Sequence, residues 1–300
     1  MSWLRRRATT VENSDDDVEV PRRISDETAS AVRRWAREIV NREADLRFRA
    51  MAIERRLDPG NRWIGGSVDH AWDRNRSVFE RFDVPVTGAK VLEFGCYMGG
   101  TAILLEAMGA KVAAVDADPA YIELARLNAE RYGATSIDFH HVADATRLPF
   151  PDSEFDVAVC YSVLEYLPDA LRDSVMREIA RTVRSGGVIF VGGTSNRLWP
   201  REIHSGRWFT NYVPRALDRL LFRSAPLPRG VWPWEIRRGF GQSVNLDLTD
   251  RGRAFLESRR ARGMGRTRYR ALRLGIFMGC IVGVWGGLLI PSISIRLKKL

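Results

Sequence analysis

The chain has 300 residues, a formal net charge of +10 at pH 7, and a composition that is 45% hydrophobic and 28% charged. This length is sufficient for one large domain with a sizeable core and additions to it. The three cysteines, Cys96, Cys160 and Cys280, lack the spacing of a metal site, and two of them lie in segments predicted to be core. These features exclude a cysteine-ligated metal centre and predict a protein of the reducing cytoplasm.

The N-terminal part divides into a polar tail and a helical extension. Residues 1–24 are polar, include the acidic run Asp15–Asp17, and are predicted to be disordered. No apolar stretch follows the basic run Arg5–Arg7, so the tail is not a secretory signal. Residues 25–86 are predicted to form a helical extension, whose second part, Arg62 to Val84, should border a ligand site.

From Thr28 to Leu57 the sequence predicts a long amphipathic helix, because apolar or small residues recur every three or four positions. Asp58-Pro59-Gly60 ends this pattern. The helix could cover a ligand cleft or pair with a partner helix, but ordinary packing is the simplest interpretation. The residues expected on its buried face are Ala29, Val32, Ala36, Ile39, Leu46, Ala50, Ile53 and Leu57.

A glycine-rich turn follows the first predicted strand. The apolar run Val91–Phe94 contains Glu93 and leads through Gly95, Gly99 and Gly100 into a helix-like segment. This pattern predicts a buried parallel strand that passes through a tight turn into a helix, as in nucleotide-binding α/β folds. Gly95 permits the unusual backbone angle that such a turn needs.

The second predicted strand ends in an acid. The run Lys111–Val115 leads to Asp116, 21 residues after Gly95. An acid about 20 residues beyond a glycine turn is placed to accept hydrogen bonds from both hydroxyls of a ribose. Asp118-Pro119 then marks the start of a helix.

Further strands alternate with helices along the next part of the chain. The strands are predicted at residues 137–142, 155–160 and 188–191, and a helix at residues 170–183 separates the last two. Strands that alternate with helices over about a hundred residues indicate a parallel sheet that helices cover on both faces.

Four blocks in this order resemble the class I S-adenosylmethionine-dependent methyltransferases, in particular the small-molecule and lipid branch called type 11. They are VLEFGCYMGG, VDADP, ADATRLPFPDSEFDVAVCYSVLEYLPD and REIARTVRSGGVIFV. The resemblance implies a Rossmann-like, doubly wound α/β fold with a mostly parallel seven-stranded sheet and an antiparallel last strand. Residues 87–193 would form its cofactor-binding core. One departure is Tyr97, which replaces the middle glycine of the family's turn and implies altered packing beside the cofactor.

The resemblance also implies residue roles toward S-adenosylmethionine. Asp116 would hold the ribose hydroxyls, Asp144 would accept from the adenine amino group, and Tyr161 would lie near the sulfonium. The remaining residues implied at the cofactor site are Glu93 and Gly95 at the methionine and ribose end, Cys96 and Gly99 in the turn, Ala117 on the adenine, and Ala145 through its backbone. No metal is implied. Asp144 could instead cap a turn, and Glu93 could pair with an arginine.

Two other classes of enzyme share part of this pattern. A nicotinamide or flavin oxidoreductase has the strand, the turn and the distal acid, but its turn normally reads G-x-G-x-x-G. A methyltransferase that acts on amines of nucleic-acid bases usually carries an Asn/Asp-Pro-Pro-Tyr/Phe tetrapeptide after the fourth strand. Neither motif is present here.

Residues 194–240 are predicted to form a cap over the substrate. This segment is rich in aromatic residues and proline, and it loosely resembles an insertion of type 11 members associated with envelope glycan, lipid or quinone pathways. Such composition favours a hydrophobic or planar methyl acceptor. Aromatic residues that only pack against one another would produce the same composition. His204 is the first candidate for a general base because imidazole titrates near neutrality, and Glu165 is the second.

Residues 241–300 are predicted to hold the last strands and a membrane-associating segment. Gly239 to Leu248 is predicted to be the sixth strand, Thr249-Asp250 the start of a helix, and Ser292 to Leu297 a strand that alternates in polarity. From Arg251 onward there are twelve Lys or Arg residues and one acid, so the basic excess of the chain lies in this tail.

An uncharged segment, residues 274–295, directly follows the arginines. Glycine recurs there at every fourth position, a pattern that lets helices approach closely in lipid. We expect residues 251–295 to contact an anionic membrane surface from the cytoplasmic side. The alternatives are a single spanning helix at 274–290, an internal packing arm, a homodimer contact, and RNA binding, for which an interleaved aromatic platform is missing.

Overall fold

The computed structural model describes residues 38–214, 217–218, 229–261, 263–281 and 290–300. The chain forms two compact units. Of the described residues, we call those within 38–159 and 181–188 the N-terminal unit, and those within 160–180 and 189–300 the C-terminal unit. The predicted tail, residues 1–24, lies outside the described residues.

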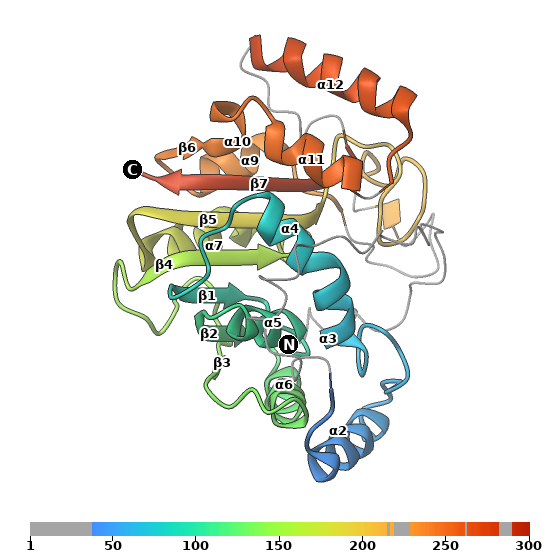
Figure 1. The fold of residues 1–300 in the computed structure, drawn as a ribbon, viewed down its shortest axis with the longest axis vertical. Helices are drawn as coiled ribbons and strands as arrows, with labels where there is room; N and C mark the ends of the chain where they lie inside the picture. Colours follow the sequence, from blue (N-terminus) through green and yellow to red (C-terminus); the bar gives the residue numbers. More distant parts are fainter. Residues whose placement is uncertain (1–37, 215–216, 219–228, 262, 282–289) are drawn as a thin grey trace. The chain divides into compact units, whose positions relative to one another are not determined.

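The seven strands have the order β3-β2-β1-β4-β5-β7-β6 (Figure 1). Parallel pairing joins β1 to both β2 and β4, and β2 to β3, whereas β6 and β7 pair antiparallel. This topology confirms the expected Rossmann-like α/β fold with an antiparallel last strand. The strands are β1 (Lys90–Phe94), β2 (Lys111–Asp116), β3 (Asp138–His141), β4 (Phe155–Tyr161), β5 (Val183–Ser195), β6 (Ser243–Asn245) and β7 (Ser292–Lys299).

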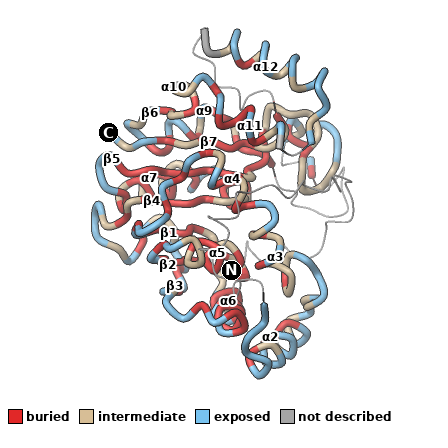
Figure 2. The backbone as a smooth tube through the Cα atoms, viewed as in Figure 1, coloured by how far each residue is buried: buried red, intermediate tan, exposed pale blue. Residues whose placement is uncertain are grey.

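The core strands are buried along most of their length, as Figure 2 shows in red. After its exposed first residue, β1 is buried at every position, which agrees with a strand covered on both faces. The helices described in the N-terminal unit are α2 (Arg42–Glu54), α3 (Ser67–His70), η2 (Ala71–Asn75), α4 (Arg76–Arg81), α5 (Gly100–Ala107) and α6 (Pro119–Arg131).

The helix predicted from Thr28 to Leu57 is not continuous, because residues 38–41 are not helical, and its buried face differs from the predicted one. In the described residues, α2 begins at Arg42, and the Asn41 side chain caps it by accepting from the Ala44 amide at 3.1 Å. Residues 28–37 lie outside the described part. The helix buries Ala44, Phe48 and Ala52, whereas the expected core residues Leu46 and Ile53 are 69% and 63% exposed and Ala50 is also exposed.

Contacts with residues far along the chain explain why α2 buries a different face from the predicted one. The helix packs beside α6 (Figure 1), and ion pairs join Arg47 to Glu130 and Arg55 to Glu123. Arg131 of α6 is buried with its guanidinium 4.3 Å from the centre of the Phe48 ring. A cation above an aromatic face is attracted by it, so this contact turns Phe48 rather than Leu46 toward the core.

The predicted sixth strand is longer than the observed one. Gly239 is the last residue of a helix, β6 covers only Ser243–Asn245, and a helical turn starts at Leu246. The turn forms because the Asn245 side chain accepts from the Asp247 amide at 2.9 Å, as an N-cap does. The helices described in the C-terminal unit include η3 (Leu164–Tyr166), α9 (Pro233–Gly239), α10 (Leu246–Thr249), α11 (Arg253–Ala261) and α12 (Arg266–Ile281), and α7 (Asp169–Thr182) begins there.

The end of the chain returns to the sheet as β7, with Ile293, Ile295 and Leu297 fully buried. This confirms the strand predicted there. Within the residues that the structure describes, no helix has the length and apolarity needed to span a membrane. Residues 282–289 of the uncharged segment lie outside that part.

Asp247 is a buried carboxyl group that helps to hold β7. Its Oδ2 accepts a hydrogen bond from the Arg296 amide at 3.0 Å. Burial, which disfavours the charged form, raises the pKa of Asp247 to about 7, and the nearby charge of Asp250 acts in the same direction. The group therefore ionises at much lower pH in the unfolded chain than in the folded protein.

We predict that Asp247 makes the folded protein less stable as pH rises from about 4 to about 7. The unfolded chain gains more from ionisation in this window, so the contribution is unfavourable above it, by up to about 4 kcal/mol. Asp247→Asn keeps the acceptor for the Arg296 amide and cannot ionise. Urea unfolding at pH 5 and pH 8 should show a smaller loss of stability in the variant. An identical loss in both proteins would contradict this origin.

Candidate functional site

The glycine turn after β1 is fixed to the end of β2. The amides of Gly95 and Cys96 both donate to the Val115 carbonyl, at 2.9 and 3.0 Å. Gly95 has a φ of 80°, in the left-handed region that glycine adopts at no steric cost. The sequence therefore placed this turn and its glycine correctly.

Asp116 bridges the glycine turn and the loop before α6. Its side chain is buried, Oδ2 accepts from the Tyr97 amide at 2.9 Å, and Oδ1 accepts from the Asp118 amide at 3.1 Å. Each carboxylate oxygen has more than one lone pair. Asp116 can thus order both loops and still accept hydrogen bonds from a ligand.

Tyr97 takes the left-handed conformation in place of glycine. Its φ is 51°, and its ring packs edge-on against Tyr121 with the ring centres 4.7 Å apart. A bulky residue in this region costs about 1–3 kcal/mol and persists only where surrounding contacts hold it. The hydrogen bond from its amide to Asp116 is one such contact.

Gly99, at the start of α5, serves the packing of the turn. Its φ is 72°, and a Cβ there would lie 3.1 Å from the Ala125 Cβ and 3.3 Å from the Phe139 ring. The predicted site residue Gly99 therefore allows α5 to approach α6 and β3 closely.

The segment from Arg62 to Val84 contacts the same turn. A Cβ on Gly100 would overlap the Ser67 carbonyl, and the Asn75 side chain donates to the Thr101 hydroxyl at 3.0 Å. The ring centre of His70 lies 4.0 Å from that of Trp63, with the two planes tilted by 52°, and burial lowers the pKa of His70 to about 4. His70 is therefore a neutral packing residue at physiological pH.

Three other predicted residues of the N-terminal unit have defined surroundings. Glu93 is buried in β1 between Ala114 and Val159 of the flanking strands. Asp144 is exposed and caps its own turn, because Oδ1 accepts from the Thr146 hydroxyl at 2.6 Å and from its amide at 3.0 Å. These bonds lower the pKa of Asp144. The following Ala145 is half-buried.

In the C-terminal unit, Tyr161 lies at the end of β4 against two glycines of β5. A Cβ on Gly192 or on Gly193 would come within 2.9 Å of the tyrosine ring. The Ser162 amide donates to the Gly192 carbonyl at 2.8 Å. These glycines therefore make room for the ring across β5.

The two residues proposed as catalytic from the sequence are hydrogen-bonded to each other. His204 Nε2 lies 2.8 Å from Glu165 Oε1, and the Glu165 side chain is completely buried. The second ring nitrogen of His204, Nδ1, lies 3.2 Å from the Tyr166 hydroxyl. Both neighbours come from the short helix η3, 38 and 39 residues before the histidine.

Glu202 positions His204, and the sequence analysis missed it. The two oxygens of this buried carboxylate accept from the amides of His204 and Ser205, at 3.0 and 2.6 Å. A bridge between Arg201 and Trp208 closes the same short loop. The sequence signal was only an acid two residues before a histidine, a spacing that is common in exposed turns.

This cluster has the geometry of an oriented general base. A carboxylate that accepts from one imidazole nitrogen fixes the tautomer and leaves the other nitrogen basic. With Nε2–H directed at Glu165, Nδ1 is the nitrogen that can take a proton, either directly or through the Tyr166 hydroxyl.

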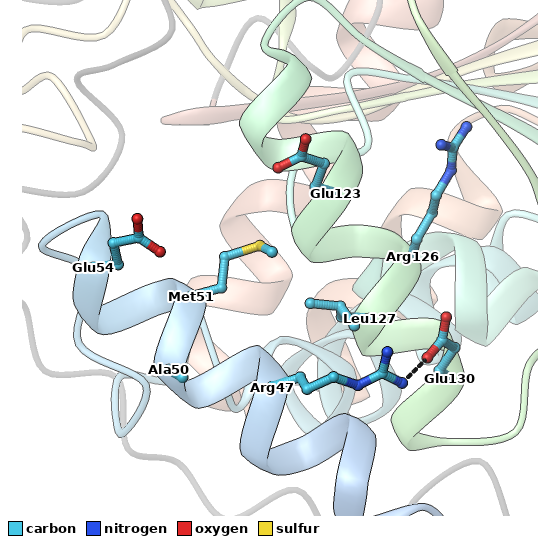
Figure 3. A pocket seen from close by; sticks show the side chains of 8 residues that line it. All are labelled: Arg47, Ala50, Met51, Glu54, Glu123, Arg126, Leu127 and Glu130. Atoms are coloured by element: carbon cyan, nitrogen blue, oxygen red, sulfur yellow. Dashed lines mark hydrogen bonds and ion pairs between the residues drawn. The ribbon is translucent and has the colours of Figure 1, made fainter.

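An open cavity of about 480 Å³ between α2 and α6 contains none of the predicted site residues (Figure 3). Charged side chains form most of its lining, and the Arg47–Glu130 ion pair spans it at 2.7 Å. Ligand pockets are mostly apolar with a few convergent polar groups. We therefore interpret this cavity as part of the contact between two helices.

Residues 91–187 match the family model described as a methyltransferase domain. A ubiquinone biosynthesis O-methyltransferase from Pectobacterium atrosepticum is 33% identical over 174 residues, which cover 55% of this chain and 69% of that protein. A protein of the same name from Thiobacillus denitrificans is 38% identical over 116 residues, 38% of this chain and about half (47%) of the relative's length. A solved S-adenosylmethionine-dependent methyltransferase from Mesorhizobium loti is similar with a TM-score of 0.46 and 16% identity, covering 75% and 96% of the two chains.

We predict that Asp116→Ala weakens binding of S-adenosylmethionine by about 1–3 kcal/mol, the cost of losing hydrogen bonds to a charged group. Calorimetry measures the affinity, and circular dichroism checks the fold. Asp118→Asn is the matched control, because it removes a neighbouring charge but keeps an N-cap for α6. An unchanged affinity in a folded Asp116→Ala protein would remove Asp116 from the binding site.

Proposed function

The chain belongs to the class I S-adenosylmethionine-dependent methyltransferases, and on this basis we propose that it methylates a hydroxyl oxygen of a small hydrophobic acceptor. The acceptor class that we favour is a lipid, a quinone precursor or a glycan-linked molecule of the cell envelope. The observation that carries the proposal is the contact of the half-buried His204 with the buried carboxylate of Glu165, because a protonated acceptor needs a base.

The donor groups of the N-terminal unit suit the cofactor. Asp116 offers a buried carboxylate for the ribose hydroxyls, and Gly95, with its positive φ, forms the adjoining turn without a side chain. We assign Asp144 Oδ2 to the adenine amino group, since Oδ1 is engaged by Thr146. The other contacts that the family resemblance implies are Glu93, Cys96, Ala117 and Ala145 of this unit, and Tyr161 at the end of β4.

The bound cofactor supplies an electrophilic methyl group on a positively charged sulfur. The cofactor would supply the methyl group and leave as a neutral thioether, and Nδ1 of His204 would take the proton of the acceptor hydroxyl. Glu165 stabilises the imidazolium that results, because its buried carboxylate accepts from Nε2. The protein otherwise contributes alignment and the exclusion of water.

Aromatic side chains beside His204 support a hydrophobic acceptor. Trp208, Phe209 and Tyr212 are 62%, 59% and 47% exposed and follow the histidine within eight residues. Large exposed rings of this kind offer apolar area for a ligand. Two of the relatives are named for methylation of oxygen in ubiquinone biosynthesis. The exposed rings and the names of these relatives both favour a hydrophobic acceptor over RNA. The only feature in favour of RNA is the basic C-terminal tail.

We further propose that the enzyme works in the cytoplasm at the inner face of a membrane. The basic excess of residues 251–300 supports this location, since anionic lipid attracts arginine. A spanning helix over residues 274–290 is no longer favoured. Both α12 and β7 belong to the C-terminal unit, so the chain between them starts and ends on one unit.

We predict that His204→Ala lowers kcat by about 10²–10⁴-fold at neutral pH, the range of general-base catalysis. The affinity for S-adenosylmethionine should remain nearly unchanged, because the base acts on the acceptor. The assay should offer phenolic and hydroxylated lipid acceptors with a radiolabelled methyl group. Glu165→Gln should lower kcat as well and change the pH dependence of the remaining activity.

The decisive measurement is the pH–rate profile between pH 6 and pH 9. Loss of the base should make the rate of His204→Ala rise with pH, as hydroxide or acceptor ionisation replaces the imidazole. Tyr166→Phe separates the two proton routes, since it keeps the ring and removes the hydroxyl. Equal rates of His204→Ala and the wild type across this range would reduce His204 to a structural residue of its loop.

A further inference from the structure

One face of α12 carries exposed arginines and exposed apolar side chains in succession. Leu274, Phe277 and Met278 are 63%, 59% and 55% exposed. Residues three and four positions apart share one face of a helix, so these three side chains form a continuous apolar surface. Arg266, Arg270 and Arg273 are also exposed, and the same spacing places them on this face, toward the start of the helix.

The opposite face of α12 attaches the helix to the C-terminal unit. Ile276 is 1% exposed, and a Cβ on Gly252 would overlap its side chain. The helix packs beside α11 (Figure 1). Leu272 and Tyr269, one and two turns before Ile276, are half-buried. The exposed apolar side chains are therefore held in place on a packed helix.

The charge on the exposed face is positive only. Residues 266–281 contain no acid, and none of the ion pairs that join described residues includes Arg266, Arg270 or Arg273. Figure 2 shows the helix as alternating exposed and intermediate turns. The arginines lie in its first half and the apolar residues in its second, over roughly 18 Å from Arg266 to Met278.

We propose that this face of α12 binds an anionic lipid surface. The arginines would stay at the level of the phosphate headgroups, and Leu274, Phe277 and Met278 would enter the boundary of the acyl chains. The occupant follows from the combination: a lipid surface offers negative charge and apolar depth side by side, in the order that the helix presents. This proposal identifies the surface through which the enzyme would attach to the membrane. It rests on the proposed location at the inner face of a membrane.

Two other occupants would leave different signatures. RNA would use the arginines alone, so its binding would collapse with salt and would not need the apolar side chains. A second copy of the chain would bury the apolar side chains, but it would place two sets of arginines at one interface, where like charges repel. Charge complementarity therefore favours lipid over both.

The test is sedimentation of the full-length protein with vesicles of phosphatidylcholine, with and without phosphatidylglycerol. We expect binding to the anionic vesicles that falls but persists at about 1 M salt, because salt screens the arginines and not apolar burial. Phe277→Asp with Met278→Asp should weaken binding by at least about tenfold. Arg270→Ala with Arg273→Ala should weaken it at low salt only.

The matched control is Leu46→Asp with Ile53→Asp on α2, where the side chains are equally exposed. This variant should bind vesicles like the wild type. The assignment is overturned if the wild type stays in the supernatant, if salt releases it fully, or if the α2 variant loses as much binding as the α12 variant. Light scattering without lipid completes the test, since a dimer that Phe277→Asp with Met278→Asp dissociates would assign the face to a second copy.

S-adenosylmethionine calorimetry separates this assignment from the methyltransferase proposal. The α12 variants should bind the cofactor with wild-type affinity, because no site residue lies on α12. If vesicle binding is absent and cofactor binding is intact, the lipid surface fails and the catalytic proposal stands. If the variants lose cofactor affinity, the substitutions disturb the fold and the result contradicts a separate lipid-binding face.

Discussion

The N-terminal unit depends on one buried carboxylate. Asp116 sits at the end of an apolar strand, where an ionised group survives only if its oxygens are hydrogen-bonded. Its two oxygens accept from the amides of Tyr97 and Asp118, so one side chain fixes both the turn after β1 and the approach to α6. The same anchoring holds Tyr97 in its left-handed conformation. The residue that we propose for cofactor recognition thus also orders two loops of the fold.

Three of the seven non-glycine residues with positive φ in the described part of the chain lie next to predicted site segments. Tyr97 after β1, Ser162 after β4 and Phe209 in the aromatic segment have φ values of 51°, 50° and 62°, although none of them is glycine. Such residues cost about 1–3 kcal/mol each and tend to occur at functional sites, where neighbouring contacts hold them in place. Two of these contacts are known here: the bond from the Tyr97 amide to Asp116 and the bond from the Ser162 amide to Gly192.

The parallel strands, the glycine turn and the distal acid could be predicted because local pattern and spacing determine them. The rotation of α2 could not, since the choice between Phe48 and Leu46 depends on Arg131, which lies more than 80 residues away. The extent of β6 was missed because the Asn245 cap and a bond from β7 to Asp247 end it. Glu165 and His204 were each identified from the sequence, but their contact across 39 residues, and the supporting Glu202, needed the fold.

The most direct test of the account compares two ligands that differ only in the ribose hydroxyls. S-adenosylhomocysteine and its analogue without these hydroxyls should be titrated by calorimetry into the wild type and Asp116→Asn. We predict that the wild type prefers the hydroxylated ligand by about 1–3 kcal/mol, the cost of hydrogen bonds to a charged group, and that the variant loses most of this preference. Equal preference in both proteins would contradict the role of Asp116 at the ribose.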